Sequence, residues 1–348
     1  MRHGGRLPNR SEPSYPGGRR IRLAVRIDGG AVGLGHAVRS SGVVNLLGDA
    51  VDLVLVGQGA GLERWFPAVP RIDPVRPLAE ICREQAADAV LLDIPHYPPG
   101  LFAELRRTGL PLICIDDMGG AIDADLVING TVLQDYHSYP QVPAGSTLLL
   151  GPRYALIRLD FGRIRWAPPL RPNVLIVVGS GERAREWAYW LVTEGVDGTA
   201  WGSVTMVVGA AFPDFDVIAE LGAQCGISLR CGLDAGALAH LLANASVALI
   251  TGGMIVYEAL AVGVPAVVFP LLANMLPEAR WLAERGCILG LGGEGGMEAP
   301  TVRSAVGHLL SDHRAAEDMS RRQRSLVDGG GMERAARAIA RLLGGVTR

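Results

Sequence analysis

Short, continuously apolar runs alternate with segments of helical periodicity along the first part of the chain. The runs lack the apolar–polar alternation of a half-exposed strand, which indicates strands covered by helices on both faces. This succession of strands and helices is typical of an open parallel sheet. The expected strands are 21–27, 51–57, 88–93, 111–116 and 125–129, and the expected helices are 37–47, 77–86 and 100–108.

The succession breaks over residues 130–172, where the Pro- and Arg-rich segment RIRWAPPLRP predicts a crossover or linker. A second series of the same kind then follows. Its expected strands are 173–179, 203–209, 227–231, 246–251 and 265–270, and its expected helices are 182–194, 236–243, 254–262 and 277–285.

Two similar halves predict an α/β protein with two Rossmann-like, parallel-sheet domains that face each other across a cleft. We expect a polar leader over 1–20, an N-terminal domain over 21–165, a C-terminal domain over 166–330 and a final amphipathic helix over 331–348. In open α/β sheets, ligands bind beyond the carboxyl ends of the strands. The loops that follow the strands are therefore the places where we expect chemistry.

Composition restricts the class of protein. The 348-residue chain is 49% hydrophobic with a net charge of −2 and a mean hydropathy of +0.25, which favours a soluble protein of two domains. Every basic side chain other than histidine is arginine, and this excludes a Schiff-base lysine and a P-loop lysine. The slight negative charge and 5% aromatic content disfavour a nucleic-acid groove.

The cysteines and the apolar stretches indicate the compartment. The five cysteines are scattered, odd in number and without a C-x-x-C pair, as expected for buried thiols in a reducing cytoplasm. No apolar stretch approaches the ~20 residues that span a bilayer, and the leader lacks the apolar core of a signal peptide. We therefore expect a cytoplasmic protein with no membrane anchor. The ligand spacing of the cysteines disfavours a zinc site, and we expect no metal, no cofactor, and a monomer or weak homodimer.

The first strand runs into RIDGGAVGLGHAVR, residues 26–39, in which glycines precede His36 at the start of a helix. Glycine allows a ligand to approach the backbone, and histidine titrates near neutral pH. A proton-transferring group and a helix-capping histidine both fit this position. Asp28 directly follows the expected strand 21–27 and Asp93 ends the expected strand 88–93, and either one is a candidate to orient the imidazole. The acidic residue of a dinucleotide fingerprint is missing about twenty positions on, which disfavours NAD.

A second informative loop, TGGMIVYEALAVGVPAVVFP, occupies residues 251–270. Here Gly252 and Gly253 turn the chain from a strand into a helix that starts near Met254. The N–H groups and the dipole of that helix are suited to hold a diphosphate without a cation. Glu258, on the second turn, fits an acceptor for a ribose diol, and a solvated helix carboxylate is the alternative.

This second loop resembles the nucleotide-sugar half of GT-B proteins, the fold shared with the lipid II-forming N-acetylglucosaminyltransferase. Together with GLGHAVR, LLGPRYALIRLDF, TMVVGAAFPDF and DGGGMERAARAI, it is similar to the nucleotide-sugar hydrolases of pseudaminic acid biosynthesis and their spore-coat polysaccharide relatives. Those enzymes remove UDP from UDP-2,4-diacetamido-2,4,6-trideoxy-β-L-altropyranose. The resemblance extends over about residues 21–343 and implies a GT-B fold.

The resemblance also implies roles for individual residues. His36 would activate or orient water beside the anomeric carbon, and Asp28 matches the RxD motif that leads into its loop. Apart from the resemblance, Asp28 and Asp93 both stay candidates for the catalytic partner that orients the imidazole. The residues that would bind the substrate lie on the loops around it. They are Arg26, Gly33, Gly35, Arg39, His96, Tyr97, Gly252, Gly253, Met254, Glu258, Asn274 and Met275.

The sequence departs from the family pattern on the sugar side. Met254 stands where a hydroxyl or small residue is usual, and Met275 stands where a glutamine is expected. The family's GGSDP is replaced by VGSGERAR, and its middle DxY motif by DIPHYP, which retains His96 and Tyr97. The loss of one hydrogen-bond donor near a sugar changes discrimination between substrates by orders of magnitude.

The expected activity is metal-independent, inverting hydrolysis of a nucleotide-activated amino-deoxy sugar, UDP-linked in the resembled family. A GT-B glycosyltransferase is the alternative, in which an acceptor hydroxyl replaces water at the same base. A nucleotide-sugar-binding protein without turnover is a third possibility. Asp116 and Asp117 are interpreted as turn-forming and helix-capping residues, and the segment MSRRQRS, residues 319–325, as a solvated helix face.

Overall fold

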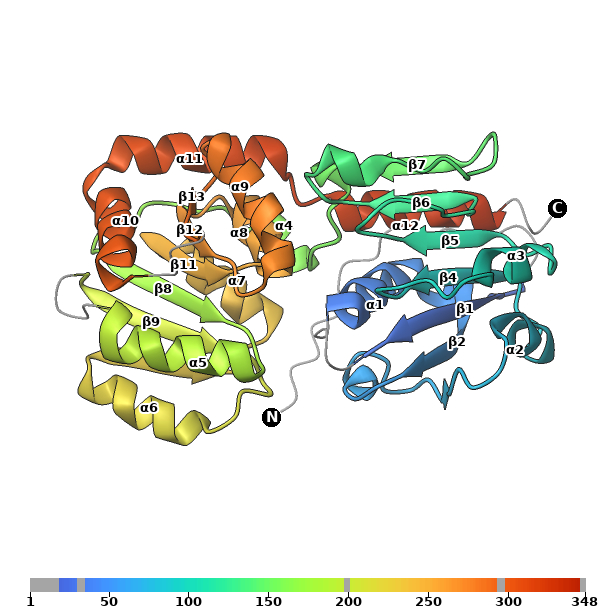
Figure 1. Ribbon diagram of the computed structural model, residues 1–348, viewed down its shortest axis with the longest axis horizontal. Coiled ribbons are helices and arrows are strands. Elements are labelled where there is room, and N and C mark those ends of the chain that lie inside the picture. The colour runs from blue at the N-terminus through green and yellow to red at the C-terminus, as the bar shows by residue number, and fades with distance from the viewer. Residues whose placement is uncertain (1–18, 30–34, 197–200, 293–297, 345–348) are drawn as a thin grey trace.

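Two parallel sheets, each covered by helices, form the two halves of the protein (Figure 1). The computed structural model describes residues 19–29, 35–196, 201–292 and 298–344. The first sheet has seven strands in the order β3-β2-β1-β4-β5-β6-β7. They are β1 (Ile21–Asp28), β2 (Val51–Gln58), β3 (Arg71–Ile72), β4 (Ala89–Asp93), β5 (Leu112–Ile115), β6 (Leu126–Asn129) and β7 (Thr147–Leu150).

The second sheet has six parallel strands in the order β10-β9-β8-β11-β12-β13, so its six positions repeat the arrangement of β3-β2-β1-β4-β5-β6 in the first sheet. In both sheets the strand order reverses next to the first strand, between β1 and β4 and between β8 and β11. Ligands bind at such switch points. The strands are β8 (Asn173–Val178), β9 (Ser203–Val208), β10 (Ile227–Cys231), β11 (Val247–Thr251), β12 (Ala266–Phe269) and β13 (Leu289–Gly290).

Helices cover both faces of each sheet, which explains why the central strands read as continuous apolar runs. The helices of the first half are α1 (Gly35–Leu47), α2 (Leu78–Glu84) and α3 (Leu101–Arg106). Those that follow are α4 (Leu159–Arg163), α5 (Glu182–Trp190, continued by a π turn over Leu191–Gly195), α6 (Phe215–Gln224), α7 (Ala235–Ala243), α8 (Met254–Val262), α9 (Leu276–Glu284), α10 (Ala299–Ser311), α11 (His313–Leu326) and α12 (Gly331–Gly344).

The α/β class with two Rossmann-like sheets is confirmed, and the ends of the expected strands agree to within one residue. The interpretation of 130–172 as a crossover is wrong in one part, because this segment contains the edge strand β7. Thr147 and Leu148 are exposed there, so the strand lacks the continuous burial that identified the others. The expected loop over 289–296 begins with the short strand β13, and 293–297 lie outside the described residues.

The chain passes between the halves twice. α4 packs on α7 and α8, and the fully buried Phe161 belongs to the core of the second half. After α11, the chain returns, and α12 packs on α1 in the first half (Figure 1). The two passages touch at Gly162 and Gly329, where a Cβ on Gly329 (φ +83°) would lie 2.4 Å from the Cα of Gly162.

Candidate active site

The imidazole of His36 lies on the first turn of α1, at the carboxyl edge of the first sheet. Its Nδ1 is 2.6 Å from Oδ1 of Asp93, the last residue of β4. Asp93 is fully buried, whereas the His36 side chain keeps 14% of its surface exposed. Because an ionised carboxylate only accepts hydrogen bonds, Nδ1 carries the proton and its N–H donates a hydrogen bond to Asp93. This leaves Nε2 as the basic nitrogen.

Arg39, one turn further along α1, holds the same carboxylate. Its Nε lies 3.0 Å from Oδ2 and its Nη2 lies 2.6 Å from Oδ1 of Asp93, while its Nη1 donates to Oδ1 of Asp117 at 2.7 Å. The buried hydroxyl of Ser40 donates to Oδ2 of Asp93 at 2.7 Å. Each oxygen of Asp93 therefore accepts from at least two groups, and the carboxylate has one defined orientation.

These contacts determine the charge of Asp93. Burial by itself raises the pKa of this carboxyl, but the positive charge of Arg39 and the hydrogen bonds from His36 and Arg39 outweigh burial and lower the pKa to about 2. Burial also opposes the charge of Arg39, yet Asp117 and Asp93 raise the pKa of its guanidinium. Asp93 is consequently an anion beside the imidazole at neutral pH.

The choice that the sequence left open between Asp28 and Asp93 is resolved by the pleat of the sheet. Ile27 is the register partner of Asp93, so Asp93 shares a face with Ile27, and Asp28 points to the opposite face. Asp28 instead forms an ion pair with Arg26 and accepts from the backbone N–H of Gln58 at 3.3 Å. Asp28 and Arg26 therefore neutralise each other and are not hydrogen-bonded to His36.

The glycine turn after β11 lies opposite this group. A Cβ on Gly35, the residue before His36, would lie 3.4 Å from the methyl carbon of Met254, the first residue of α8. Gly253 turns the chain with φ +93° into α8, whose first N–H groups have no partner within the helix. A Cβ on Gly252 would lie 2.6 Å from Sδ of Met275, so the thioether covers the turn.

Glu258 has its polar contacts away from the glycine turn. Its carboxylate is buried, and both oxygens accept from Arg158, at 2.7 Å from Nε to Oε1 and 2.7 Å from Nη2 to Oε2. Burial raises the pKa of Glu258, and Arg158 opposes that rise. The carboxylate thus ties the segment before α4 to α8, and neither expected environment, a ribose diol or solvent, is what surrounds it.

The other residues expected to bind the substrate lie outside the group formed by His36, Arg39 and Asp93. His96 is exposed, and the Tyr97 hydroxyl lies 2.9 Å from Sγ of Cys114 and donates to the carbonyl of Ile115 at 3.2 Å, inside the first half. Asn274 is exposed beside Met275, before α9. Gly33 lies outside the described residues.

Several contributing residues were not expected. Ser40, Asp117 and Arg158 contact the groups above, and a cross-domain contact joins the two halves nearby. There the hydroxyl of Tyr257 on α8 accepts from the backbone N–H of Val132 at 3.0 Å and donates to Glu278 on α9. Arg39 and Ser40 follow His36 by three and four residues, and this spacing is the one sequence signal that placed them on its helix face. The other contacts join segments that are distant in the sequence.

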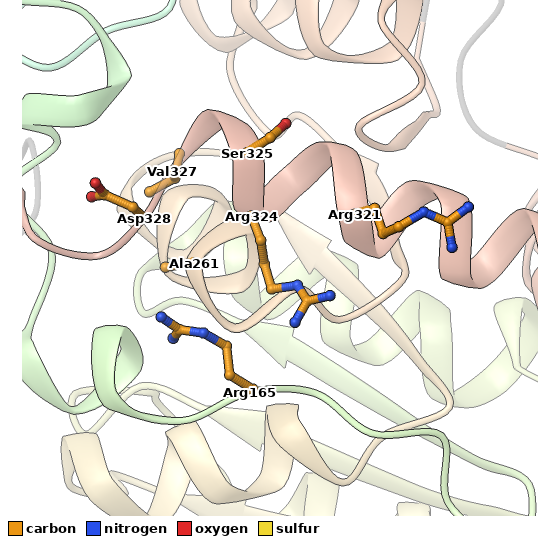
Figure 2. A pocket seen from close by; sticks show the side chains of 7 residues that line it. All are labelled: Arg165, Ala261, Arg321, Arg324, Ser325, Val327 and Asp328. Carbon is orange, nitrogen blue, oxygen red and sulfur yellow. The ribbon is translucent and has the colours of Figure 1, made fainter.

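Two hollows lie away from this group and contain none of the expected site residues. One, of about 420 Å³, lies between the linker and α11 and is lined by Arg165 from the linker and by Arg321 and Arg324 from α11 (Figure 2). The other, of about 460 Å³, lies near the amino ends of β5, β6 and β7. In the part of the chain that the structure describes, no three His, Cys, Asp or Glu side chains group as metal ligands, and no helix has the length and apolarity needed to cross a bilayer.

Comparison with known proteins agrees with this architecture. No protein-family model matches the chain. A curated relative, the spore coat polysaccharide biosynthesis protein SpsG of Bacillus subtilis (strain 168), is 22% identical over 280 residues, which cover 78% of this chain and 82% of the relative.

Among solved structures, the calicheamicin glycosyltransferase CalG4 matches with a TM-score of 0.64 at 18% identity, over 94% of this chain and 99% of that one. The UDP-GlcNAc 2-epimerase of Neisseria meningitidis, bound to UDP-GlcNAc, matches with a TM-score of 0.60 at 11% identity, over 92% of this chain and its full length. The chain has the GT-B fold that the sequence predicted.

Proposed function

We propose that this protein is a GT-B enzyme that transfers a glycosyl group from a nucleotide sugar to an acceptor hydroxyl, with His36 as the catalytic base. The observation that carries the proposal is the 2.6 Å contact between Nδ1 of His36 and the anionic Asp93, made directly opposite the glycine turn of the second half. A base with a fixed tautomer and an anion-binding helix terminus face each other across the two halves.

The donor end of the proposal rests on the start of α8. Unpaired N–H groups and the helix dipole favour a diphosphate at this terminus. The structurally similar epimerase is described with UDP-GlcNAc bound, and the relative SpsG is named for polysaccharide biosynthesis. A nucleotide sugar with its diphosphate at this helix terminus would have its anomeric carbon toward His36.

The reaction follows from this arrangement. Nε2 of His36 takes the proton of the acceptor hydroxyl while the acceptor oxygen bonds to the anomeric carbon. The bond from that carbon to the diphosphate oxygen breaks, and the nucleoside diphosphate leaves with the electron pair toward the N–H groups of α8. Asp93 stabilises the imidazolium that forms, and attack opposite the leaving group inverts the anomeric centre. A positioned base of this kind contributes ~10²–10⁴-fold to the rate.

Hydrolysis is the second candidate, and the motifs GLGHAVR, LGPRYALIR and DGGGMER favour it. Water then replaces the acceptor hydroxyl, and the base and the donor position are unchanged. The comparisons name a glycosyltransferase and an epimerase and no hydrolase, so they support the transferase better than the hydrolase that the sequence led us to expect.

The test uses purified protein and a panel of UDP-, dTDP- and CMP-sugars, each with and without a mixture of acceptor alcohols. Release of nucleotide and formation of a glycoside only with acceptor support the transferase, and free sugar without acceptor supports the hydrolase. His36→Ala is expected to abolish either reaction, and His240→Ala, which replaces an exposed histidine of α7, is the matched control. Tight nucleotide binding without turnover of any donor would overturn the proposal.

A further inference from the structure

Asp117 occupies a loop that Asp116 holds in place. Oδ2 of Asp116 accepts from the backbone N–H groups of Met118 at 3.0 Å and Gly119 at 2.6 Å, and from the hydroxyl of Tyr139 at 2.8 Å. This turn follows β5 at the carboxyl edge of the first sheet. The fixed loop leaves the side chain of Asp117 48% exposed and directed at Arg39.

Arg39 bridges two carboxylates with different ends of one planar group. Nε and Nη2 contact Asp93, and Nη1 donates to Asp117 at 2.7 Å. Only 15% of the Arg39 side chain is exposed. A guanidinium anchored at both ends cannot rotate away from Asp93, so the hydrogen bond to Asp117 also fixes the carboxylate that orients His36.

The charges of His36, Arg39, Asp93 and Asp117 cancel when His36 is protonated during the reaction. When His36 has taken a proton, the two cations His36 and Arg39 lie beside the two anions Asp93 and Asp117. Without Asp117, one buried carboxylate would face two cations, which disfavours the imidazolium.

The charged groups that interact with Asp117 are Arg39 on α1, Asp116 on its own loop and Glu278 on α9. Glu278 does not compete with Arg39 for Asp117, because its carboxylate has the same negative charge as Asp117. Its Oε1 accepts a hydrogen bond from Tyr257. Among the described residues, Arg39 is the cation seen in an ion pair with Asp117.

We propose that Asp117 is a positioning residue for the base, acting on His36 through Arg39 and Asp93. The inference rests on the proposed function, because it assigns Asp117 a part in the same proton transfer. It differs from the turn-forming role that the sequence suggested, which Asp116 performs instead. Asp117 itself need not contact the substrate.

The test measures kcat and the donor KM against pH for Asp117→Ala and Asp117→Asn. Asp123→Ala is the control, since Asp123 pairs with Arg106 at 2.7 Å in the same half of the molecule, in contact with neither His36 nor Asp93. For Asp117→Ala we expect kcat to fall roughly tenfold, as for other partners that orient a histidine, at unchanged KM. The acidic limb of the profile should move down by roughly half a pH unit, because a lost anion makes the imidazolium less stable.

Asp117→Asn retains a hydrogen-bond acceptor for Arg39 without the charge, so we expect the same pH shift with a smaller loss of kcat. This variant decides the question if Asp117→Ala fails to fold. A profile and kcat equal to those of Asp123→Ala would overturn the inference, and so would a change confined to KM. If His36→Ala retains full turnover, the proposed function itself fails; if only the Asp117 variants behave as wild type, the proposed function stands without this inference.

Discussion

Replacement of Asp93 by asparagine tests the centre of the site with the smallest change in shape. One oxygen of Asp93 accepts from His36 and Arg39, and the other accepts from Ser40 and Arg39. Every neighbour is a donor, so the NH₂ group of an asparagine would meet donors wherever it pointed. If it faces His36, Nδ1 must become the acceptor and the proton moves to Nε2, which removes the base.

The expected loss of kcat and the expected loss of folding stability can both be estimated. A base held in the wrong tautomer reduces kcat by about 10³–10⁴-fold. The pKa of Asp93, lowered to about 2 from 3.8, corresponds to about 2 kcal/mol of folding stability for this fully buried group. Because the folded-state pKa lies below the unfolded one, this stability is present above about pH 4 and is lost as the pH falls toward 2.

The assay combines turnover with unfolding. Nucleotide release by Asp93→Asn is compared with wild type at pH 7, and urea unfolding of both proteins is followed from pH 7 to pH 3. We expect a stability difference near neutral pH that narrows as the solution becomes acidic. Ser40→Ala, which removes one hydrogen bond and no charge, is the control and should cost about 1 kcal/mol with little effect on kcat. Turnover of Asp93→Asn within threefold of wild type would refute the assigned tautomer.

Three further outcomes can be measured at other contacts. Glu258→Gln should lower stability in urea by about 2–3 kcal/mol because Arg158 loses its buried partner, and the double variant Glu258→Gln/Arg158→Met should recover most of the loss. Gly252→Ala should weaken UDP binding in calorimetry by about tenfold, or ~1.4 kcal/mol, because the added methyl displaces Met275, and Met275→Ala in the same chain should restore part of it. Tyr257→Phe should cost about 1–3 kcal/mol in thermal unfolding, since a buried amide of the first half then lacks its acceptor; an unchanged melting temperature would contradict the cross-domain contact.

Much of the fold was predictable because the central strands are buried on both faces and therefore read as unbroken apolar runs. The edge strand β7 was missed for the complementary reason, since Thr147 and Leu148 are exposed and interrupt the pattern. The helical patterns were equally clear for α1, α7 and α8, whose bounds agree closely with expectation.

The site was predictable only in part. A glycine-flanked histidine after the first strand indicated His36, but Asp28 and Asp93 both end strands at the switch point. Only the register, which pairs Ile27 with Asp93, shows which carboxylate shares the face of α1. The contact between Arg158 and Glu258 joins residues one hundred positions apart, and no local pattern in a single sequence encodes such a pair.

The return of the chain at α12 has a consequence for synthesis. Met332, Ala336 and Ile339 fill the core beneath α1 and the first sheet, although the ribosome makes them after the whole second sheet. The domain translated first therefore has an incomplete interior while its neighbour is already folding, which reverses the usual order in which domains mature from the N-terminus. The apolar surface of the first domain therefore stays uncovered until α12 has been synthesised and packs on it.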